Sequence, residues 1–202
     1  MWRVTHQHPR VIDNSTGFRN KLRRLFAEVC AVLGDPIPLE KEDKYIIAFF
    51  DPSVIPVPYY SAEITQQYLI TPDPKEERRV RARGDRDGFT YYYTIKEEMS
   101  KGIRTEREEI IGEHEYRTLL SLRDSKLKTI RKQRISFFWN ERYFEIDIFT
   151  APKVHKGLVL MELERSGRRK KLILPPFLEM VRDVTGDKRY GNRSLASGIA
   201  LT

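Results

Sequence analysis

The stretch Leu39-Glu40-Lys41-Glu42-Asp43-Lys44-Tyr45-Ile46-Ile47 is the part of the sequence from which we interpret the rest of the chain. We expect it to form a strand, which directs alternate side chains to one face and places Glu40, Glu42 and Lys44 together, with neighbours about 6.6 Å apart. At that distance two bare carboxylates repel by about 2.5 kcal/mol if the effective dielectric constant is near 20. A hard divalent cation or a basic surround would offset this repulsion. Taken alone, the triplet is more simply interpreted as a solvated strand face. The charge patterns of the other strands are needed to distinguish this interpretation from a ligand or metal site.

The composition predicts one globular domain with an appendage and an anionic partner. With 202 residues, 40% of them hydrophobic, the chain can bury a sizeable core. It carries 37 Lys and Arg against 29 Asp and Glu, a net charge of +8. Nucleic acid, an acidic membrane surface and a polyphosphate would all suit that charge.

Several classes of site and location are disfavoured by what the sequence lacks. Its longest apolar run, residues 45–50, is too short to span a membrane, and no signal-peptide pattern opens the chain. Cys30 is the single cysteine, which excludes a disulfide framework or a thiolate metal site and favours a reducing, cytoplasmic setting. There is no phosphate-binding P-loop and no dinucleotide fingerprint. The four histidines have neither metalloprotease spacing nor an identifiable nucleophile partner.

The first 35 residues are predicted to be distinct from the rest. Residues 8–12 form a short strand-like piece without a partner nearby in sequence. An amphipathic helix then begins at a cap among residues 14–16 and ends at Gly34. We therefore place the boundary of the main domain at residue 36, with residues 36–202 forming it.

Most of the remaining chain has the two-residue alternation of β-strands, interrupted by two predicted helices. The helices are expected at residues 113–122 and 175–184, and the polar tail 186–193 is expected to fold over an edge or an opening. A hairpin is expected around Asn140-Glu141. Besides the opening strand, the expected strands are 62–70, 79–83, 89–96, 104–108, 132–139, 144–148 and 159–164.

The charged faces of these strands are segregated by sign. An ordinary half-exposed sheet would put apolar residues inside and mixed polar residues outside. Here one strand carries three arginines, another carries Lys132 and Arg134, and four carry pairs of carboxylates. Like charges along a strand are destabilising unless neighbouring strands or a ligand supply the opposite sign. Closing about eight strands into a barrel would face acidic strands with basic ones around a polar tunnel.

The ordered set of motifs resembles the CYTH superfamily, also called triphosphate tunnel metalloenzymes. The motifs cover about residues 39–196 and are Glu40-x-Glu42-x-Lys44, Gln66-Gln67-Tyr68-Leu69, Arg79-x-Arg81-x-Arg83-Gly84, Tyr93-Thr94-Ile95-Lys96, Glu106-x-Glu108, Lys132-x-Arg134, Phe144-Glu145-Ile146-Asp147 and Glu162-x-Glu164. This resemblance implies an α+β fold, an eight-stranded antiparallel β-barrel with flanking helices. It also implies Mg²⁺- or Mn²⁺-dependent hydrolysis of a triphosphate compound, either inorganic tripolyphosphate or a nucleoside or thiamine triphosphate.

The resemblance assigns a role to each charged residue of the tunnel. Carboxylates suit hard cations, and arginine offers phosphate oxygens paired contacts that lysine cannot. Metal binding is expected of Glu40, Glu42, Glu162 and Glu164. Phosphate binding is expected of Lys44, Arg79, Arg81, Arg83, Lys96, Lys132 and Arg134. Catalytic roles, including placement of a second metal or of the attacking water, are expected of Lys44, Glu106, Glu108, Glu145 and Asp147.

Two alternatives accompany this hypothesis. The subgroup most similar to this chain carries the tunnel domain after a P-loop NTPase domain, so residues 1–13 are interpreted as the remnant of such an upstream region. Some members of that subgroup bind a nucleotide or a phosphoinositide without hydrolysis, which would make the chain a regulatory or trafficking module. A nucleic-acid-binding barrel is the less favoured alternative; it would need exposed stacking aromatics beside the arginines, for which residues 91–93 and 137–139 are the candidates.

Overall fold

The computed structural model describes residues 42–48, 50–74, 76–100, 103–164 and 173–201, without the side chains of 98–100, 103–105 and 164. The predicted strand at residues 8–12, the amphipathic helix that follows it and the boundary at residue 36 lie outside the described residues. These three features stay predictions.

A single antiparallel sheet of nine strands, in the order β5-β4-β3-β2-β6-β7-β8-β1-β9, is the main feature of the fold. The strands are β1 (Glu42–Ile47), β2 (Tyr59–Leu69), β3 (Glu76–Asp85), β4 (Gly88–Ser100), β5 (Ile103–Ile111), β6 (Ile130–Trp139), β7 (Arg142–Ala151), β8 (Val159–Glu164) and β9 (Met180–Asp183). The helical elements are η1 (Pro52–Val54), α2 (Glu113–Leu120), η2 (Lys153–His155), η3 (Lys188–Tyr190) and α3 (Asn192–Ala196). The predicted antiparallel, strand-rich class with few helices is confirmed. The predicted count of eight strands and the full closure are wrong, because β5 and β9 form two separate edges of the sheet among the described strands.

The ninth strand replaces a predicted helix. Residues 175–184 were expected to be helical, but the chain turns there and then forms β9 against β1. The amide of Ala48 donates to the carbonyl of Glu179 at 2.9 Å, and the amide of Val184 donates to the carbonyl of Lys44 at 2.8 Å. Proline is tolerated in the first turn of a helix, but its presence does not by itself produce a helix. The backbone groups along the edge of β1 need hydrogen-bond partners, and the local sequence of residues 175–184 does not reveal that they supply them.

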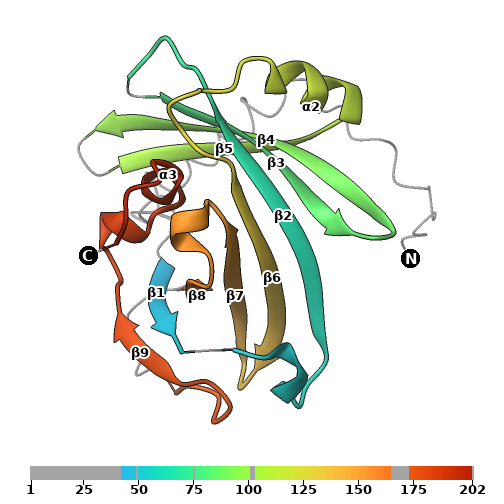
Figure 1. Ribbon diagram of the computed structural model, residues 1–202, viewed down its shortest axis with the longest axis vertical. Coiled ribbons are helices and arrows are strands. Elements are labelled where there is room, and N and C mark those ends of the chain that lie inside the picture. Colours follow the sequence, from blue (N-terminus) through green and yellow to red (C-terminus); the bar gives the residue numbers. More distant parts are fainter. Residues whose placement is uncertain (1–41, 49, 75, 101–102, 165–172, 202) are drawn as a thin grey trace, which may run out of the picture. The chain divides into compact units, whose positions relative to one another are not determined.

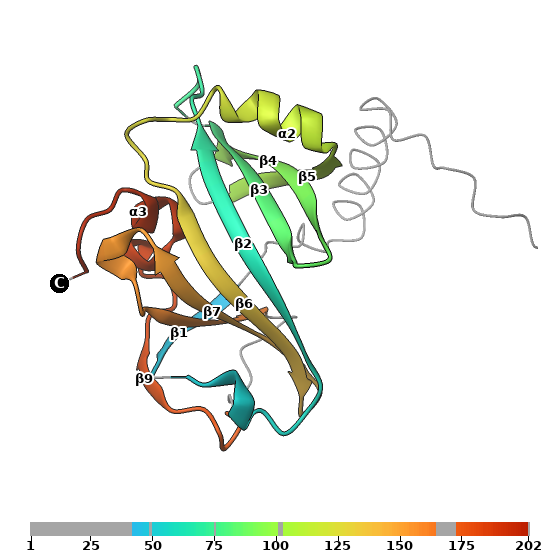
Figure 2. The ribbon, with the colours of Figure 1, turned by 45° about the vertical axis from the view of Figure 1, so that its right-hand side comes forward.

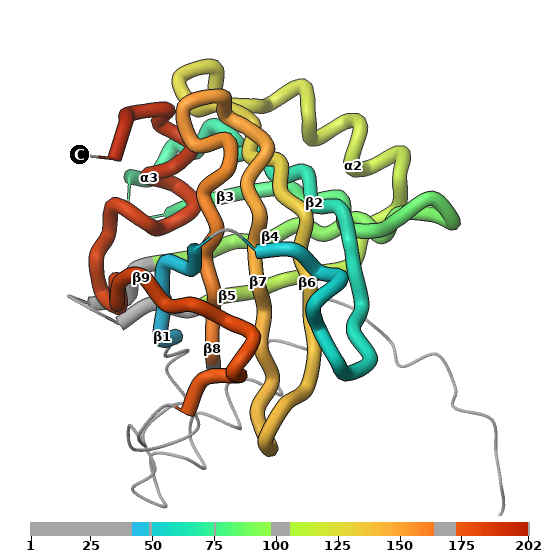
Figure 3. Tube along the Cα trace, turned by 60° about the horizontal axis from the view of Figure 1, so that its bottom comes forward, coloured from blue at the N-terminus to red at the C-terminus, as the bar shows by residue number. Residues whose placement is uncertain are grey.

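The sheet curves strongly, so that its two arms face each other (Figure 1). Seen from below, β6, β7 and β8 run side by side in front, and β3, β4 and β5 cross behind them (Figure 3). The β6–β7 hairpin turns at Asn140 and Glu141, whose φ angles are +47° and +60°. Two successive positive φ angles match the tight turn that the twist of a hairpin favours. The curvature encloses the face of the sheet that carries the charged residues.

Apolar residues lie on the opposite, outer face. On β6, Ile135 and Phe137 are buried in a cluster that packs beneath the segments around residues 50–57 and 174–178. Helix α2 covers the outer face of β3 and β4, where the ring of Tyr116 lies 4.7 Å from that of Tyr91 (Figure 2). Because side chains alternate along a strand, burying these residues outside directs their neighbours inward. We call the face with Lys44, Arg81 and Arg134 the inner face.

The C-terminal segment fills one end of the inner face. Tyr190 of η3 and Leu195 of α3 are buried with Tyr68, Leu160 and other apolar side chains. The amide of Lys128 donates to the carbonyl of Ala196 at 2.6 Å and fixes the segment to the loop that precedes β6. The polar tail 186–193, predicted to fold over an edge or an opening, thus packs against the inner face through Tyr190, whose carbonyl accepts from Lys44 Nζ at 3.4 Å.

Candidate functional site

The first wall of the site is formed by β6, β7, β8 and β1. The strand register places Arg134 opposite Asp147, Glu145 opposite Glu162, and Glu162 opposite Lys44. Cross-strand partners have Cβ atoms about 5 Å apart, so these acids and bases reach one another directly. Acidic and basic strands were predicted to face each other around a tunnel. In this wall, acidic and basic side chains instead meet between neighbouring strands of the same arm.

Arg134 lies at the centre of this wall. Its Nε donates to Asp147 Oδ1 at 2.7 Å, and its Nη2 donates to Asp147 Oδ2 at 2.7 Å and to Glu162 Oε2 at 2.8 Å. Its Nη1 also pairs with Glu145, and Lys132 pairs with Asp147 from the other side. Asp147 is fully buried. Burial opposes the charge on Arg134, but Asp147, Glu162 and Glu145 together raise its pKa well above the usual value.

Three further groups of this wall are coupled electrostatically. Lys44 Nζ lies 2.7 Å from Glu162 Oε1 and 3.9 Å from Glu42 Oε2. Burial would raise the pKa of Glu162, but the cations of Lys132, Lys44 and Arg134 lower it far below its usual value. Burial raises the pKa of Glu42, and the neighbouring Glu162 charge raises it further. Glu42 is therefore the acid of this wall whose negative charge is least well compensated.

The second wall is formed by β3, β4 and β5. Arg79 Nη2 donates to Glu106 Oε1 at 3.0 Å, and Arg81 Nη2 donates to Glu108 Oε1 at 2.8 Å. Lys96 Nζ lies 2.7 Å from Glu106 Oε2. The Nε atoms of Arg79 and Arg81 are buried and have no hydrogen-bond partner in the described part of the chain. A buried donor without a partner is costly, and Arg78, on the opposite face of the same strand, has a buried Nε of the same kind.

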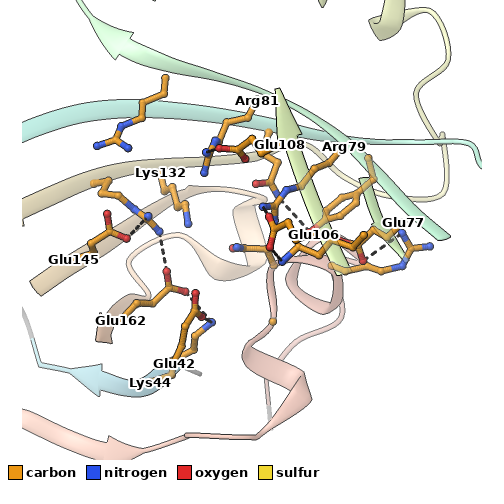
Figure 4. A pocket seen from close by; sticks show the side chains of 18 residues that line it. Glu42, Lys44, Glu77, Arg79, Arg81, Glu106, Glu108, Lys132, Glu145 and Glu162 are labelled. Atoms are coloured by element: carbon orange, nitrogen blue, oxygen red, sulfur yellow. Dashed lines mark hydrogen bonds and ion pairs between the residues drawn. The ribbon is translucent and has the colours of Figure 1, made fainter. Parts of the chain in front are cut away.

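The two walls enclose a pocket of about 380 Å³. Figure 4 shows Glu42, Lys44, Glu145 and Glu162 on one side of it and Arg79, Arg81, Glu106 and Glu108 on the other. Among the described residues, eight Lys and Arg and six Glu line it, so the formal charge of this part of the lining is positive and favours an anion. Its size is at the lower end of the range of about 300–1,000 Å³ that is typical of small-molecule sites.

The structure brings most of the predicted site residues to this pocket. Those that line it are Glu42, Lys44, Arg79, Arg81, Arg83, Lys96, Glu106, Glu108, Lys132, Arg134, Glu145 and Glu162. Asp147 does not line it but lies behind Lys132 and Arg134. Glu40 and the side chain of Glu164 lie outside the described part of the chain, although the register places the backbone of Glu164 opposite Glu42.

Other pocket residues had no assigned role. Gln66 and Tyr68 occur in one of the motifs and alternate onto the inner face of β2, so the alternation could have indicated them. Glu77 of β3 also lines the pocket. Gly191, Asn192 and Arg193 reach it from the C-terminal segment, and no local pattern connects that segment to the strands.

The donor set is compatible with a hard cation, although it is incomplete. Glu42 and Glu162 provide carboxylate oxygens on the first wall. Burial, and after it the charge of Glu162, raise the pKa of Glu42, and a bound cation would offset both effects. Within the described residues, no group of three His, Cys, Asp or Glu side chains could hold a metal ion. A third carboxylate would have to come from Glu40 or Glu164.

The curved antiparallel sheet with its charged inner face matches the CYTH-type tunnel fold. One solved structure of this class, the inorganic triphosphatase NE1496, is 27% identical to this chain and has a TM-score of 0.57, covering 82% of this chain and 99% of its own. A second structure of NE1496, described as a hypothetical protein, is 29% identical with a TM-score of 0.56 and covers 80% of this chain and 99% of its own.

A more distant match is the putative adenylyl cyclase HpAC1 from Hippeastrum, described as having a dominant triphosphatase activity. It is 15% identical, covers 64% of this chain and 80% of its own, and has a TM-score of 0.46. No family model and no curated protein matches the sequence. None of the helices in the described ranges is long and apolar enough to cross a lipid bilayer.

Proposed function

We propose that this protein hydrolyses a triphosphate compound in the charged pocket with the help of Mg²⁺ or Mn²⁺. The observation that carries the proposal is the excess of basic residues over carboxylates in the described lining of the pocket, which includes the guanidinium donors of Arg79 and Arg81. Phosphate oxygens satisfy such donors with strong, charge-assisted hydrogen bonds. The likeness to the inorganic triphosphatase NE1496, which extends over 99% of that chain, supports a triphosphate as the ligand.

The basic residues divide into two groups by their partners. Arg79, Arg81, Arg83 and Lys96 would bind the phosphate oxygens, because all four line the pocket from the second wall. Lys132 and Arg134 are held by Asp147, so they would supply fixed positive charge rather than move to the ligand. Asp147 would then position these two residues and would not contact the substrate. Preorganised charges of this kind stabilise a phosphoryl-transfer transition state without reorganising during the reaction.

The carboxylates of the first wall would hold the cation. Glu42 and Glu162, with Glu40 and Glu164 of the same motifs, would bind it. A bound Mg²⁺ or Mn²⁺ supplies charge neutralisation and polarises phosphate oxygens. Lys44 keeps its proton, because Glu162 offsets the effect of burial and raises the Lys44 pKa, and it would therefore pair with an oxygen of the transferred group.

The attacking water would be oriented by the glutamates that face the phosphates. Glu106 and Glu108 on the second wall and Glu145 on the first all reach the pocket. Each accepts a hydrogen bond from an arginine, which fixes a carboxylate oxygen in place. Such an oxygen can accept a hydrogen bond from water and receive its proton as the new P–O bond forms, while the bond from the same phosphorus to the bridging oxygen breaks and that oxygen leaves with the rest of the phosphate chain.

A phosphate-release panel tests the proposal. The 202-residue chain would be incubated with tripolyphosphate, ATP, GTP and thiamine triphosphate, with Mg²⁺, with Mn²⁺ and with excess chelator. We expect metal-dependent release from at least one substrate. Release that persists in chelator would overturn the metal requirement. Tight binding of a triphosphate or of an inositol phosphate without release would favour the non-catalytic alternative, a regulatory module that recognises a nucleotide or a phosphoinositide head group.

A further inference from the structure

The segment at and after the end of β9, residues 183–190, wraps around Lys44 of β1, and we call it the lysine clamp. The amide of Val184 donates to the carbonyl of Lys44 at 2.8 Å, which is the last backbone bond between the two strands in this direction. The amide of Lys44 then donates to the hydroxyl oxygen of Thr185 at 2.9 Å. The hydroxyl therefore replaces the backbone acceptor of a longer strand, and both backbone groups of Lys44 that face this edge are held.

The local sequence of the clamp makes the chain turn back toward β1. The amide of Thr185 donates to Asp183 Oδ1 at 2.9 Å, a side-chain turn that ends β9. Gly186 follows with a φ angle of +78°, which glycine adopts without steric cost. The amide of Arg189 donates to Asp187 Oδ1 at 3.0 Å and opens η3. These successive turns bring the last residue of η3 beside the side chain of Lys44.

The clamp also holds the amine of Lys44. Lys44 Nζ donates to the carbonyl of Tyr190 at 3.4 Å and lies 2.7 Å from Glu162 Oε1. An ammonium group has three donors, so these two contacts leave the third for Glu42, at 3.9 Å, or for a phosphate oxygen. Tyr190 is itself fixed, because its ring is buried and its hydroxyl accepts from Arg182, whose guanidinium carbon lies 5.5 Å from the ring centroid. The clamp thus holds Lys44 at its backbone and at its tip.

We propose that Thr185 and Tyr190 are positioning residues for Lys44: the Thr185 hydroxyl fixes its backbone, and the Tyr190 carbonyl holds its amine at the pocket. This inference rests on the proposed function, in which Lys44 pairs with an oxygen of the transferred group. Thr185 is not among the described residues that line the pocket, so it acts through Lys44. A lysine held in place before the ligand arrives loses less side-chain freedom on binding, and the affinity rises accordingly.

Trace acetylation of the ligand-free protein, measured for each lysine by mass spectrometry, tests the clamp without any substrate. The labelling rate of Lys44 is divided by that of the exposed Lys156 in the same sample. Thr185→Val keeps the shape of the side chain and removes the hydroxyl, so we expect this ratio to rise about 2- to 12-fold, the scale of one hydrogen bond. Thr185→Ser should restore the parental ratio. Thr150→Val is the matched control, because that hydroxyl also bonds the backbone of a neighbouring strand, the Arg131 carbonyl at 3.2 Å.

A double-mutant cycle tests whether Thr185 acts through Lys44. The ligand is imidodiphosphate with Mg²⁺, a phosphate chain that resists cleavage, and its Kd is measured by calorimetry. We expect Thr185→Val to raise the Kd about 2- to 12-fold in the parent and to have no further effect in Lys44→Met. If Thr185→Val does not fold, Tyr190→Phe provides the same comparisons, because it keeps the buried ring and removes only the hydroxyl that Arg182 holds.

The outcomes separate the clamp from the proposed hydrolysis. A Lys44 labelling ratio that stays at the parental value in the clamp variant would overturn the inference. So would an increase in Kd that is as large in Lys44→Met as in the parent, because the hydroxyl would then have only a general structural role. Parental protein that does not bind imidodiphosphate and releases no phosphate from tripolyphosphate would count against the proposed function, and the labelling ratio alone would then decide the positioning of Lys44.

Discussion

Arg81 and Arg134 both line the pocket, but their donors have different partners. Arg134 makes bonds to three carboxylates, from Asp147, Glu145 and Glu162. Arg81 bonds Glu108 through Nη2, while its Nε is buried without a partner among the described residues. Burial also lowers the Arg81 pKa, a direction that shows incomplete compensation of its charge. A phosphate anion would supply the negative charge that Arg81 lacks. Arg134 already has compensating negative charge from its three carboxylate partners.

Replacing Arg81 by Ala should weaken triphosphate binding by about 1.5–3 kcal/mol, the scale of a charged hydrogen bond, and leave the fold intact. The matched control is Arg78→Ala, which removes the same side chain from the same strand on the outer face, where it pairs with Glu76 at 2.8 Å. Calorimetric titration with tripolyphosphate would measure both variants. Equal affinities for the two variants would assign Arg81 a structural role.

Asp147→Asn should destabilise the fold by about 3–5 kcal/mol, because it leaves two buried cations, Lys132 and Arg134, without their shared carboxylate. Urea denaturation at pH 7 measures the loss. The control is Glu113→Gln, which breaks an exposed pair with Arg117 on α2 and should leave the unfolding midpoint unchanged. A midpoint for Asp147→Asn equal to that of the control would mean that water, not the carboxylate, compensates the two cations.

Glu42→Gln should not reduce stability at pH 7 in the absence of metal, and it should diminish the stabilisation by Mg²⁺ or Mn²⁺. The pKa of Glu42 is higher in the folded protein than in the unfolded chain, so its ionisation opposes folding at neutral pH. That cost disappears as the pH falls below about 4.5, so any advantage of the variant should vanish there too. Melting temperatures at pH 7 and pH 4, with metal and with chelator, check this. If metal raises the melting temperature of Glu42→Gln, and of the double variant with Glu40→Gln, as much as that of the parent, the cation binds elsewhere.

At the scale of elements, the β3–β4 hairpin sets the position of the second wall. Residues from Glu76 to Asp85 pair continuously with β4, and this pairing fixes the spacing of Arg79, Arg81 and Arg83. Gly84 ends the arginine run and lies opposite Phe89. A Cβ atom at Gly84 would lie 2.0 Å from the carbonyl oxygen of Gly88 and 2.7 Å from the Cα of Phe89. Only glycine therefore permits the two strands to approach so closely at the tip.

Gly84→Ala should destabilise the protein by about 1–3 kcal/mol, because the contacts of the added methyl group are to backbone, which cannot move aside as a side chain can. Gly112→Ala is the matched control, since its Cβ would meet no atom within 4 Å. Unfolding midpoints of the two variants provide the comparison. If Gly84→Ala is as stable as the control, the tip of the hairpin opens without cost and does not determine the arginine spacing.

At the scale of the whole molecule, the net charge of +8 and the basic excess in the pocket have the same sign. Positive charge distributed over the protein raises the local concentration of anions and is screened by salt over about 10 Å at 0.1 M. The pocket adds fixed geometry to this diffuse attraction. Binding of a polyanion should therefore combine a salt-dependent contribution with one that depends on pocket residues.

Tripolyphosphate at 100 times its Kd should stabilise the fold by about 2.7 kcal/mol through mass action on the folded state. The shift in melting temperature should decrease as NaCl is raised, since the screening length shortens. Arg81→Ala should require more tripolyphosphate for the same shift, whereas Arg78→Ala should match the parent. A shift that does not depend on salt, or one that is equal in all three proteins, would place the bound anion outside the pocket.

Much of the sheet could be predicted from the sequence because strand alternation is a local property. The run Arg79-x-Arg81-x-Arg83 and the pair Lys132 and Arg134 each identify one face of a strand without knowledge of its neighbours. Helix α2 was likewise predicted from its apolar spacing, and its observed range is Glu113–Leu120. Residues 175–184 were mispredicted, because the hydrogen-bonding edge of β1 that draws them into β9 lies more than a hundred residues away.

The sequence by itself determined which side chains share a face and that acidic and basic faces would have to meet. Only the tertiary structure decided which acid meets which base, because cross-strand register brings together residues from distant parts of the chain. That register buries Asp147 behind Arg134 and places Glu162 between Glu145 and Lys44. It also lets the C-terminal segment bring Arg193 to the pocket. Whether a charged group is a ligand site or a structural support depends on these partners, and partners are set by long-range pairing rather than by local sequence.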